Sequence, residues 1–278
     1  IYSVLIMRIN IIPFLFSFSL LLSCSKDSDE FVPPDNQNIP LISKEYYLDE
    51  LVHEYTYNDK NLLFESKGKW TYSVYSYDRE NKLSSYDMYV DPGMVSSDWQ
   101  TAQQSMNRTE WVNPENTEMN GRANYFYINS RLIKIDVTRF PGGVKSTTAY
   151  EYDDKGRISK RIYYYEDQPS AFTEFLYDEN GNLIAEIKKE MIDGVPVLMV
   201  KTEYEFDDKN NPYIAFQRLL RPGEYTNKNN IVRRVQTLYF DAPMVEKIQE
   251  TNYTYEYNSE GYPIKKNGSI TLEYLPRE

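Results

Sequence analysis

Histidine is the side chain on which many catalytic and metal sites depend, and this chain has only one, His53. A Ser-His-Asp triad needs a histidine as its general base, and protein zinc sites are built largely from histidine and cysteine. In the segment LVHEYTY, His53 alternates with Leu51 and Tyr55, so the three side chains share one face of an extended strand. We therefore expect His53 to be a structural strand residue, and we predict no catalytic residue, metal site or cofactor.

Carboxylates are abundant, with 42 Asp and Glu residues, and two kinds of site could use them. The segment DENGN places oxygen-bearing side chains at Asp178, Asn180 and Asn182, the every-second spacing of a calcium loop. Such a loop would need glycine where Leu183 stands and a bidentate glutamate where Lys189 stands, so a hairpin turn is the better interpretation. A glycosidase needs two carboxylates about 5–10 Å apart, a geometry that one sequence does not reveal. The sequence contains no Gly-rich phosphate loop and no nucleophile elbow.

Cys24 is the only cysteine, which excludes an intramolecular disulfide and a thiolate metal site. It ends an apolar run over residues 11–22 that follows Met7 and Arg8; the run is short for a membrane span but suits a signal peptide. The end of this run, LLSC, resembles the bacterial lipobox, in which the signal peptide is cut before the cysteine and the cysteine is acylated. We therefore expect a signal peptide over residues 1–23, with translation starting at Met7, and acyl chains on Cys24 that anchor the protein in a membrane.

An acidic segment, SKDSDE, directly follows Cys24 and resembles the surface-export signal of Bacteroidetes lipoproteins. The next stretch, FVPPDNQNIP, is rich in Pro, Asn and Asp and indicates an extended linker. We expect residues 24–44 to be a lipidated, disordered tether on an outer-membrane lipoprotein exposed at the cell surface; a domain facing the periplasm is the alternative. The net charge of −11 argues against nucleic acid as a partner and against electrostatic docking on anionic lipid.

The chain has three tryptophans, Trp70, Trp99 and Trp111. Trp99 and Trp111 lie in the stretch from Val90 to Arg122, which has the composition of a long loop. Exposed aromatic rings on loops can stack on sugars or anchor a protein partner. The alternative is that Trp70 packs in the sheet and the other two hold the loop in place. We take the three as candidate ligand-binding residues.

A seven-residue motif occurs six times, with aromatic residues at its first and third positions. The copies are YTYNDKN from Tyr55, YSYDREN from Tyr75, YEYDDKG from Tyr150, FLYDENG from Phe175, YEFDDKN from Tyr204 and YEYNSEG from Tyr255. Two positions after each copy stands an apolar residue or proline: Leu63, Leu83, Ile158, Leu183, Pro212 and Pro263. The two aromatics point to the same face of a strand, the Asp or Asn at position four can accept a backbone hydrogen bond, and the Gly or Asn at position seven tolerates positive φ. This pattern is typical of a type I turn with a left-handed residue and a bulge, the common three-residue hairpin connection.

Repetition of this kind predicts an antiparallel meander of hairpins over residues 45–278, forming a single domain. At about 12 residues for a strand and its turn, this domain has room for about 14–18 strands. So long a sheet must curl or close, because open edges invite aggregation. We therefore predict an all-β fold that forms a large barrel or a strongly curved sheet. The segment YFYINSRL from Tyr125 is a weaker copy with a shortened turn, and Val90–Arg122 and Gln217–Asn230 break the rhythm, so we expect function there.

The hairpin motifs resemble YD (Rhs-like) repeats. The combination of FDDKNNP, NKNNIV and YEYNSEGYP is more specifically similar to a group of Bacteroidetes lipoproteins of unknown function described as porin-like, over residues 46–275. This resemblance implies a large antiparallel barrel or strongly curved sheet, and it brings no catalytic residues. A membrane-spanning barrel needs an apolar outer band about 25 Å tall. In RISKRIYYY, strict alternation puts Ile158, Lys160 and Ile162 on one face, which is not apolar throughout, so we expect a water-soluble β-domain.

Together, these features predict a membrane-anchored, non-enzymatic β-scaffold of the cell envelope that binds an extracellular glycan or a partner protein. The first alternative is a passive structural or adhesin-like surface protein. A glycosidase-type enzyme is the less favoured alternative.

Overall fold

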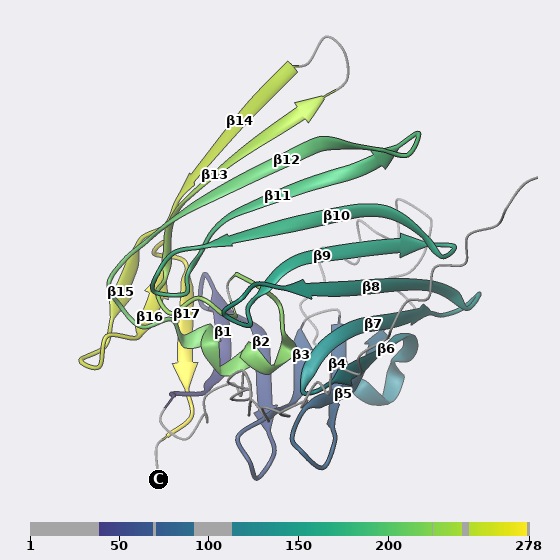
Figure 1. The fold of residues 1–278 in the computed structure, drawn as a ribbon. Coiled ribbons are helices and arrows are strands. Elements are labelled where there is room, and N and C mark those ends of the chain that lie inside the picture. Colours follow the sequence, from purple (N-terminus) through teal and green to yellow (C-terminus); the bar gives the residue numbers. More distant parts are fainter. Residues whose placement is uncertain (1–38, 69–70, 92–112, 224, 241–244, 277–278) are drawn as a thin grey trace, which may run out of the picture. The chain divides into compact units, whose positions relative to one another are not determined.

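The computed structural model describes residues 39–68, 71–91, 113–223, 225–240 and 245–276, and their fold is all-β (Figure 1). One 17-stranded antiparallel sheet follows the order of the chain, which confirms the predicted meander of about 14–18 strands. The strands are β1 (Ile42–Tyr47), β2 (Glu50–Tyr57), β3 (Leu63–Gly68), β4 (Thr71–Tyr77), β5 (Leu83–Val90), β6 (Glu118–Ile128), β7 (Arg131–Arg139), β8 (Val144–Tyr152), β9 (Ile158–Tyr165), β10 (Gln168–Tyr177), β11 (Leu183–Ile192), β12 (Val195–Phe206), β13 (Ile231–Phe240), β14 (Val245–Asn252), β15 (Tyr255–Tyr257), β16 (Pro263–Lys266) and β17 (Ile270–Tyr274). Two 3-10 helices accompany them, η3 (Pro114–Asn116) and η4 (Pro212–Leu219). Neither these helices nor any other among the described residues has the length and apolar composition needed to cross a membrane.

The sheet is strongly curved, because its first strand also pairs with its last: β1 runs antiparallel to both β2 and β17. It does not close into a barrel. Among the described residues, β14 pairs with β13 and β15 pairs with β16, while the chain passes directly from β14 to β15 through Tyr253 and Thr254. At this passage the backbone N–H of Tyr253 donates to the carbonyl of Val232, and Thr254 accepts from Asn267, both at 2.8 Å. Of the two predicted forms, the structure has the curved sheet.

The motif builds the hairpin turns that the sequence predicts. In the third copy, Asp153 Oδ1 accepts from the backbone N–H groups of Lys155 and Arg157, at 3.0 and 2.8 Å. Gly156 adopts φ +76°, and the ladder shifts register between Glu151 and Tyr152. A type I turn followed by a left-handed residue and a bulge has these features. The weaker copy at Tyr125 instead has a two-residue turn in which both residues have positive φ.

One prediction about strand faces was wrong, and the bulge explains why. Ile158 lies opposite Tyr152 in the ladder, whereas Arg161 lies opposite Tyr150. Since Tyr150 and Tyr152 share a face, Ile158 and Arg161 also share one, although strict alternation puts them on opposite faces. Lys160 lies on the other face, with its Nζ 4.4 Å from the centre of the Phe172 ring.

The fifth copy departs from the hairpin pattern. Asp207 Oδ1 accepts from the backbone N–H of Lys209, as in the other copies, but it also accepts from Asn230, at 3.0 Å in each case. Residues between these two points leave the sheet; we call 208–229 the inserted segment. Asn211 caps η4 by accepting from the backbone N–H of Tyr213 at 3.0 Å, and Pro212 occupies the first helical turn. An Asn cap followed directly by proline is a strong helix-start pattern, so it overrides the hairpin here.

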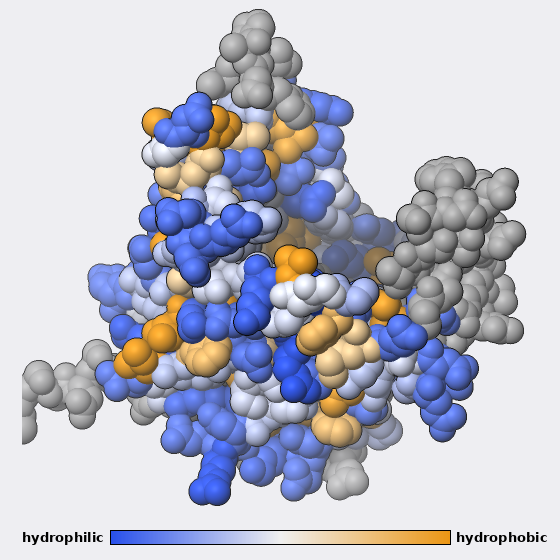
Figure 2. Space-filling view, turned by 90° about the vertical axis from the view of Figure 1, so that its right-hand side faces the viewer, coloured by the Kyte–Doolittle hydropathy of each residue, from blue (hydrophilic) through white to orange (hydrophobic). Residues whose placement is uncertain are grey.

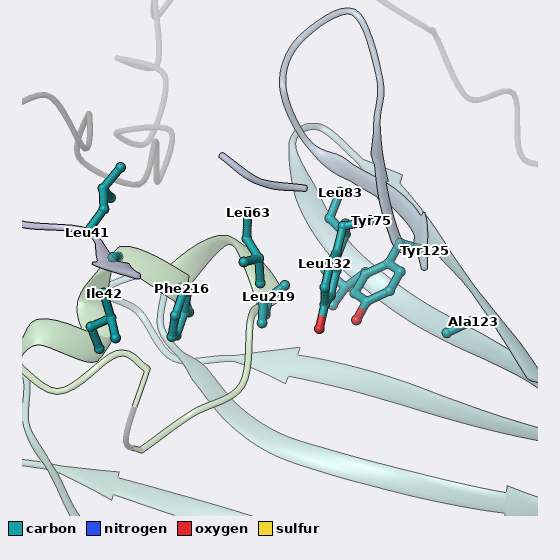
Figure 3. Close-up of a cluster of buried hydrophobic side chains, with 11 residues drawn as sticks. Leu41, Ile42, Leu63, Tyr75, Leu83, Ala123, Tyr125, Leu132, Phe216 and Leu219 are labelled. Carbon is teal, nitrogen blue, oxygen red and sulfur yellow. The ribbon is translucent and has the colours of Figure 1, made fainter. Parts of the chain in front are cut away.

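Helix η4 lies within the curve of the sheet and supplies much of its core (Figures 1 and 3). The ring of Phe216 is 2% exposed, and its centre lies 5.0 Å from that of Tyr55. The cluster consists of Ala215, Phe216 and Leu219 from η4, with Leu41, Ile42, Leu63, Tyr75, Leu83, Ala123, Tyr125 and Leu132. The irregular stretch predicted from Gln217 therefore begins inside the core, where Gln217 is 5% exposed.

The third-position tyrosines of the motif join neighbouring hairpins. Tyr257 of the sixth copy donates its hydroxyl hydrogen to the carboxylate of Asp207. The other four each donate to the backbone carbonyl of an apolar residue at the start of the strand before. The pairs are Tyr57 with Ile42, Tyr77 with Leu63, Tyr152 with Leu132 and Tyr177 with Ile158, at 2.8–2.9 Å. Tyr127 of the weaker copy does the same with Leu83 at 2.9 Å. The fifth copy has Phe206 at this position, which lacks the hydroxyl, so the series stops where the inserted segment leaves the sheet.

Candidate functional site

The residues singled out from the sequence fall partly outside the described part of the chain. Four of them lie outside it: Cys24, Trp70, Trp99 and Trp111. The lipid anchor and the tryptophan contacts therefore stay predictions. His53 is an exposed residue of β2, with its Nδ1 3.6 Å from Glu45 Oε2 and its ring beside that of Tyr55, at 6.1 Å between centres. This is the structural strand position that we expected.

The DENGN segment is a hairpin turn, which confirms that interpretation. Asp178 Oδ1 accepts from the backbone N–H of Asn182 at 2.8 Å, and Gly181 adopts φ +93°. Asn182 is 2% exposed, and its Oδ1 accepts from the backbone N–H groups of Lys228 and Asn229, at 2.9 and 3.1 Å. This turn therefore holds the end of the inserted segment. Within the described ranges, no group of three or more His, Cys, Asp and Glu side chains is placed to hold a metal ion.

A cavity of about 300 Å³ lies between the inserted segment and the strands from β11 to β13 and from β15 to β17. Viewed from the side on which the β9–β10 and β11–β12 hairpins turn, the concave side of the sheet opens in a recess with hydrophilic side chains around its rim (Figure 2). The cavity wall is mainly aromatic and polar. It includes four tyrosines, Tyr204, Tyr213, Tyr253 and Tyr255, four asparagines, Asn211, Asn227, Asn229 and Asn230, and the charged residues Glu186, Arg234 and Lys266.

The asparagines of the wall hold the inserted segment in place. Asn211 Nδ2 donates to the carbonyl of Asn227 at 2.8 Å, and Asn230 Nδ2 donates to Asp207 Oδ2 at 3.0 Å. Asn227 Oδ1 accepts from the backbone N–H of Leu183 at 2.7 Å, which ties the segment to the start of β11. These bonds fix the position of the cavity wall before any ligand arrives.

Two polar atoms of the wall, Asn227 Nδ2 and Arg234 Nε, are buried without a hydrogen-bond partner among the described residues. The side chain of Asn227 is fully buried, at 0% exposure, and its Nδ2 makes no hydrogen bond. A buried donor without an acceptor costs about 1–3 kcal/mol. Because its side chain is not exposed at all, the Asn227 amide supports the cavity wall from behind and does not face the open space.

A charged side of the wall lies on β11, β12 and β13. Tyr204 donates to Glu186 Oε1 at 2.8 Å, and its pKa is raised, chiefly by burial and further by the carboxylate of Glu186. Arg234 lies opposite Tyr204 in the ladder, and its buried Nε has no hydrogen-bond partner in the described residues. Glu186 is the one carboxylate among the described residues that line the cavity, so this wall lacks the carboxylate pair of a glycosidase.

The opposite side of the wall is aromatic. The ammonium group of Lys266 lies 4.8 Å from the centre of the Tyr253 ring and 5.9 Å from that of Tyr255. Tyr255 is fixed by a hydrogen bond from its hydroxyl to the carbonyl of Ile231 at 2.9 Å. Pre-positioned rings beside polar donors and acceptors can stack on a flat apolar ligand face and bind its hydroxyl groups.

A close approach of the inserted segment to β11 shapes the floor of the cavity. Gly223 adopts φ +98°, which side chains rarely tolerate. A Cβ atom at this position would lie 3.3 Å from Leu183 Cδ2. Glycine therefore lets the backbone take this conformation against the strand.

No family model and no curated protein matches this chain. Solved structures similar to it include a porin-like protein from Bacteroides uniformis, at 10% identity over 84% of this chain and 98% of that one, with a TM-score of 0.39. A porin-like protein from Bacteroides vulgatus is 10% identical over 86% of this chain and 100% of that one, with a TM-score of 0.40. A Photorhabdus luminescens Tc holotoxin pore is 15% identical over 81% of this chain but only 10% of that one, with a TM-score of 0.30. Porin-like proteins are thus among the structures that this chain is similar to, while the YD-repeat relationship and the lipid anchor stay predictions.

Proposed function

We propose that this chain is a membrane-anchored, non-enzymatic β-scaffold of the cell envelope and that its cavity binds a glycan. The observation that carries the proposal is the cavity of about 300 Å³, walled by tyrosine rings and by polar and charged side chains, among them Glu186 and Arg234. This volume is at the lower end of the range for small-ligand sites, about 300–1,000 Å³, so it suits a monosaccharide or a short stretch of a longer chain.

The chemistry of the wall matches the two faces of a sugar. The ring of Tyr253, beside which the ammonium group of Lys266 lies, can cover the C–H face of a pyranose. The guanidinium of Arg234 offers donors and Glu186 offers an acceptor, which together suit ring hydroxyl groups. The wall is held by hydrogen bonds within the protein, so binding would need little reorganisation.

Binding is tested by probing the mature chain against a glycan array and measuring the affinity of each hit by calorimetry. Tyr253→Ala removes a cavity ring, and we expect it to weaken binding at least about tenfold, the loss of one well-packed aromatic contact. Tyr165→Ala is the matched control, since Tyr165 is 59% exposed on β9 and does not line the cavity. No hit on the array, or a hit that Tyr253→Ala leaves unchanged, would contradict the proposed site. A hit that depends on Trp99 or Trp111 instead would move the site to the tryptophan-bearing loop.

The anchor is a separate part of the proposal and rests on the LLSC sequence at Cys24 and the acidic segment behind it. We expect Cys24→Ala to abolish membrane association of the expressed protein. We also expect external protease to remove the domain from intact cells. If the domain is protected while the membrane association depends on Cys24, the protein faces the periplasm.

A further inference from the structure

Arg221 is a cation without a counter-ion in the described part of the chain. It follows η4 directly, after Leu220 in the left-handed conformation, and it does not line the cavity described above. Its guanidinium lies 5.9 Å from the centre of the Tyr225 ring, and among the described residues it makes no hydrogen bond and no ion pair. Arginine is always charged in proteins, so a full positive charge lies here with no anionic partner among the residues that the structure describes.

A wall of tyrosines from β4, β5, β6 and β8 surrounds this cation. The rings of Tyr75 and Tyr86 stack at 5.5 Å between centres, and Tyr86 and Tyr125 lie 6.3 Å apart. The hydroxyls of Tyr75 and Tyr125 point in the same direction (Figure 3). Arg221 is close enough to Tyr75, Tyr86, Tyr125 and Tyr150 to interact electrostatically with all four.

Three hydroxyls of this wall are unused. The neighbouring tyrosines Tyr77, Tyr127 and Tyr152 donate to backbone carbonyls, whereas the hydroxyls of Tyr86, Tyr125 and Tyr150 make no hydrogen bond with any described residue. Burial raises the pKa of both Tyr125 and Tyr150, so their phenols keep the proton at neutral pH and remain donors. One guanidinium and three phenol hydroxyls that lie near it therefore have donors with no hydrogen-bond acceptor among the described residues.

We propose that Arg221, Tyr86, Tyr125 and Tyr150 form a binding site for an oxyanion, the carboxylate, sulfate or phosphate group of a small ligand. A guanidinium matches the spacing of two oxygens on any of these groups, and phenol hydroxyls can donate to the others. The site goes beyond the proposed glycan cavity and does not depend on it, because the two share no residue.

The charge of the whole chain limits the size of the ligand. With a net charge of −11, the protein repels large polyanions at a distance, so a nucleic acid or an anionic lipid surface is a poor partner. The site lies on the concave side of the sheet, where Tyr125 is only 8% exposed. Arg221 itself is exposed, so a small anion can reach the guanidinium and form charge-assisted hydrogen bonds with it.

The test uses the mature chain and three anionic probes, inorganic sulfate, inorganic phosphate and glucuronate, with glucose as the neutral control, each titrated by calorimetry. We expect at least one anion to bind and glucose to leave this site unoccupied. Arg221→Gln should lower the affinity for the anion at least about tenfold, because hydrogen bonds to a charged group are lost. Arg233→Gln is the matched control: Arg233 pairs with Glu205 and Glu250 on the sheet, so its loss should leave anion affinity unchanged.

A second pair of variants keeps the proposal testable if Arg221→Gln fails to fold. Tyr86→Phe and Tyr150→Phe each remove a hydroxyl that has no partner in the described protein, so we expect both to fold normally and to weaken the anion by about threefold to tenfold. Tighter binding of glucuronate than of sulfate and phosphate would identify the ligand as a sugar acid. Tighter binding of sulfate or phosphate would identify it as the inorganic anion or one of its esters. If none of the three anions binds, or if the Arg221 and tyrosine variants bind as tightly as the wild type, the proposal is overturned.

Discussion

Removal of a single hydroxyl from the tyrosine series should cost measurable stability, and Tyr177→Phe is the sharpest case. Tyr177 donates to the carbonyl of Ile158 at 2.8 Å, and Ile158 is 7% exposed, so little water can replace the lost donor. Burial raises the pKa of Tyr177, as expected for a phenol held away from solvent. A hydrogen bond of this kind contributes about 1 kcal/mol, and a carbonyl left without a donor costs up to about 3 kcal/mol. We therefore expect Tyr177→Phe to lower the free energy of unfolding by about 1–3 kcal/mol.

The assay is urea denaturation followed by circular dichroism, with the m-value compared between variants so that the same transition is measured. Tyr150→Phe is the control, because it makes the same chemical change at a hydroxyl that bonds to no described residue. We expect this control to stay within about 0.5 kcal/mol of the wild type. Tyr77→Phe and Tyr177→Phe lie in separate hairpins, so their costs should add. Equal stability of Tyr177→Phe and Tyr150→Phe would refute the idea that these bonds join the hairpins.

Three further changes test the turns and the core. Phe216→Ala should lower the free energy of unfolding by about 3–5 kcal/mol, since Phe216 is 2% exposed inside the curve of the sheet, and a loss below about 1 kcal/mol in urea would contradict a core role for η4. Gly156→Ala should cost about 1 kcal/mol because φ +76° favours glycine, and a thermal melt equal to the wild type would count against the left-handed turn residue. Burial opposes the ionisation of Asp153, but the backbone N–H and guanidinium of Arg157 outweigh it and lower its pKa, so this carboxylate should stabilise the fold above about pH 4 and lose that effect as the pH falls further. Asp153→Asn keeps the turn acceptor and should therefore be less stable than the wild type by about 0.5–1 kcal/mol at pH 7, with a gap that narrows in acid; a gap independent of pH would contradict the ion pair.

The turns of the sheet were predictable because local chemistry determines them. Asp153 and Gly156 need only their own neighbours to form the turn, so seven letters are enough to identify it. The number of strands followed from the length of the domain at about 12 residues for a strand and its turn, once the motif had shown that the domain is a meander of hairpins. The bulge that the turn creates was expected, but it also shifts the alternation of side chains along β9. Strict alternation therefore puts Lys160 on the face of Ile158, whereas it lies on the other face.

The core and the cavity depend on contacts between distant parts of the chain. Nothing local in Pro212 to Leu219 indicates that the curved sheet will close around it, although Asn211 and Pro212 mark a helix start. Asn227 meets Leu183 across 44 residues, and Tyr77 meets the carbonyl of Leu63 on the neighbouring strand β3. A sequence motif shows that tyrosines share a face, but only the register of the folded sheet shows what each hydroxyl reaches. The run NKNN at 227–230 is the sequence feature that indicates a polar, hydrogen-bonding role for the irregular segment.

The most direct test of the central claim is a crystal structure of the mature chain with a glycan that the array identifies. We predict a sugar ring in the cavity, in contact with Tyr253, and ligand hydroxyl groups within hydrogen-bond distance of Arg234 and Glu186. A ligand bound elsewhere, with the cavity free of sugar, would contradict the claim that the inserted segment and the sheet together form the binding site.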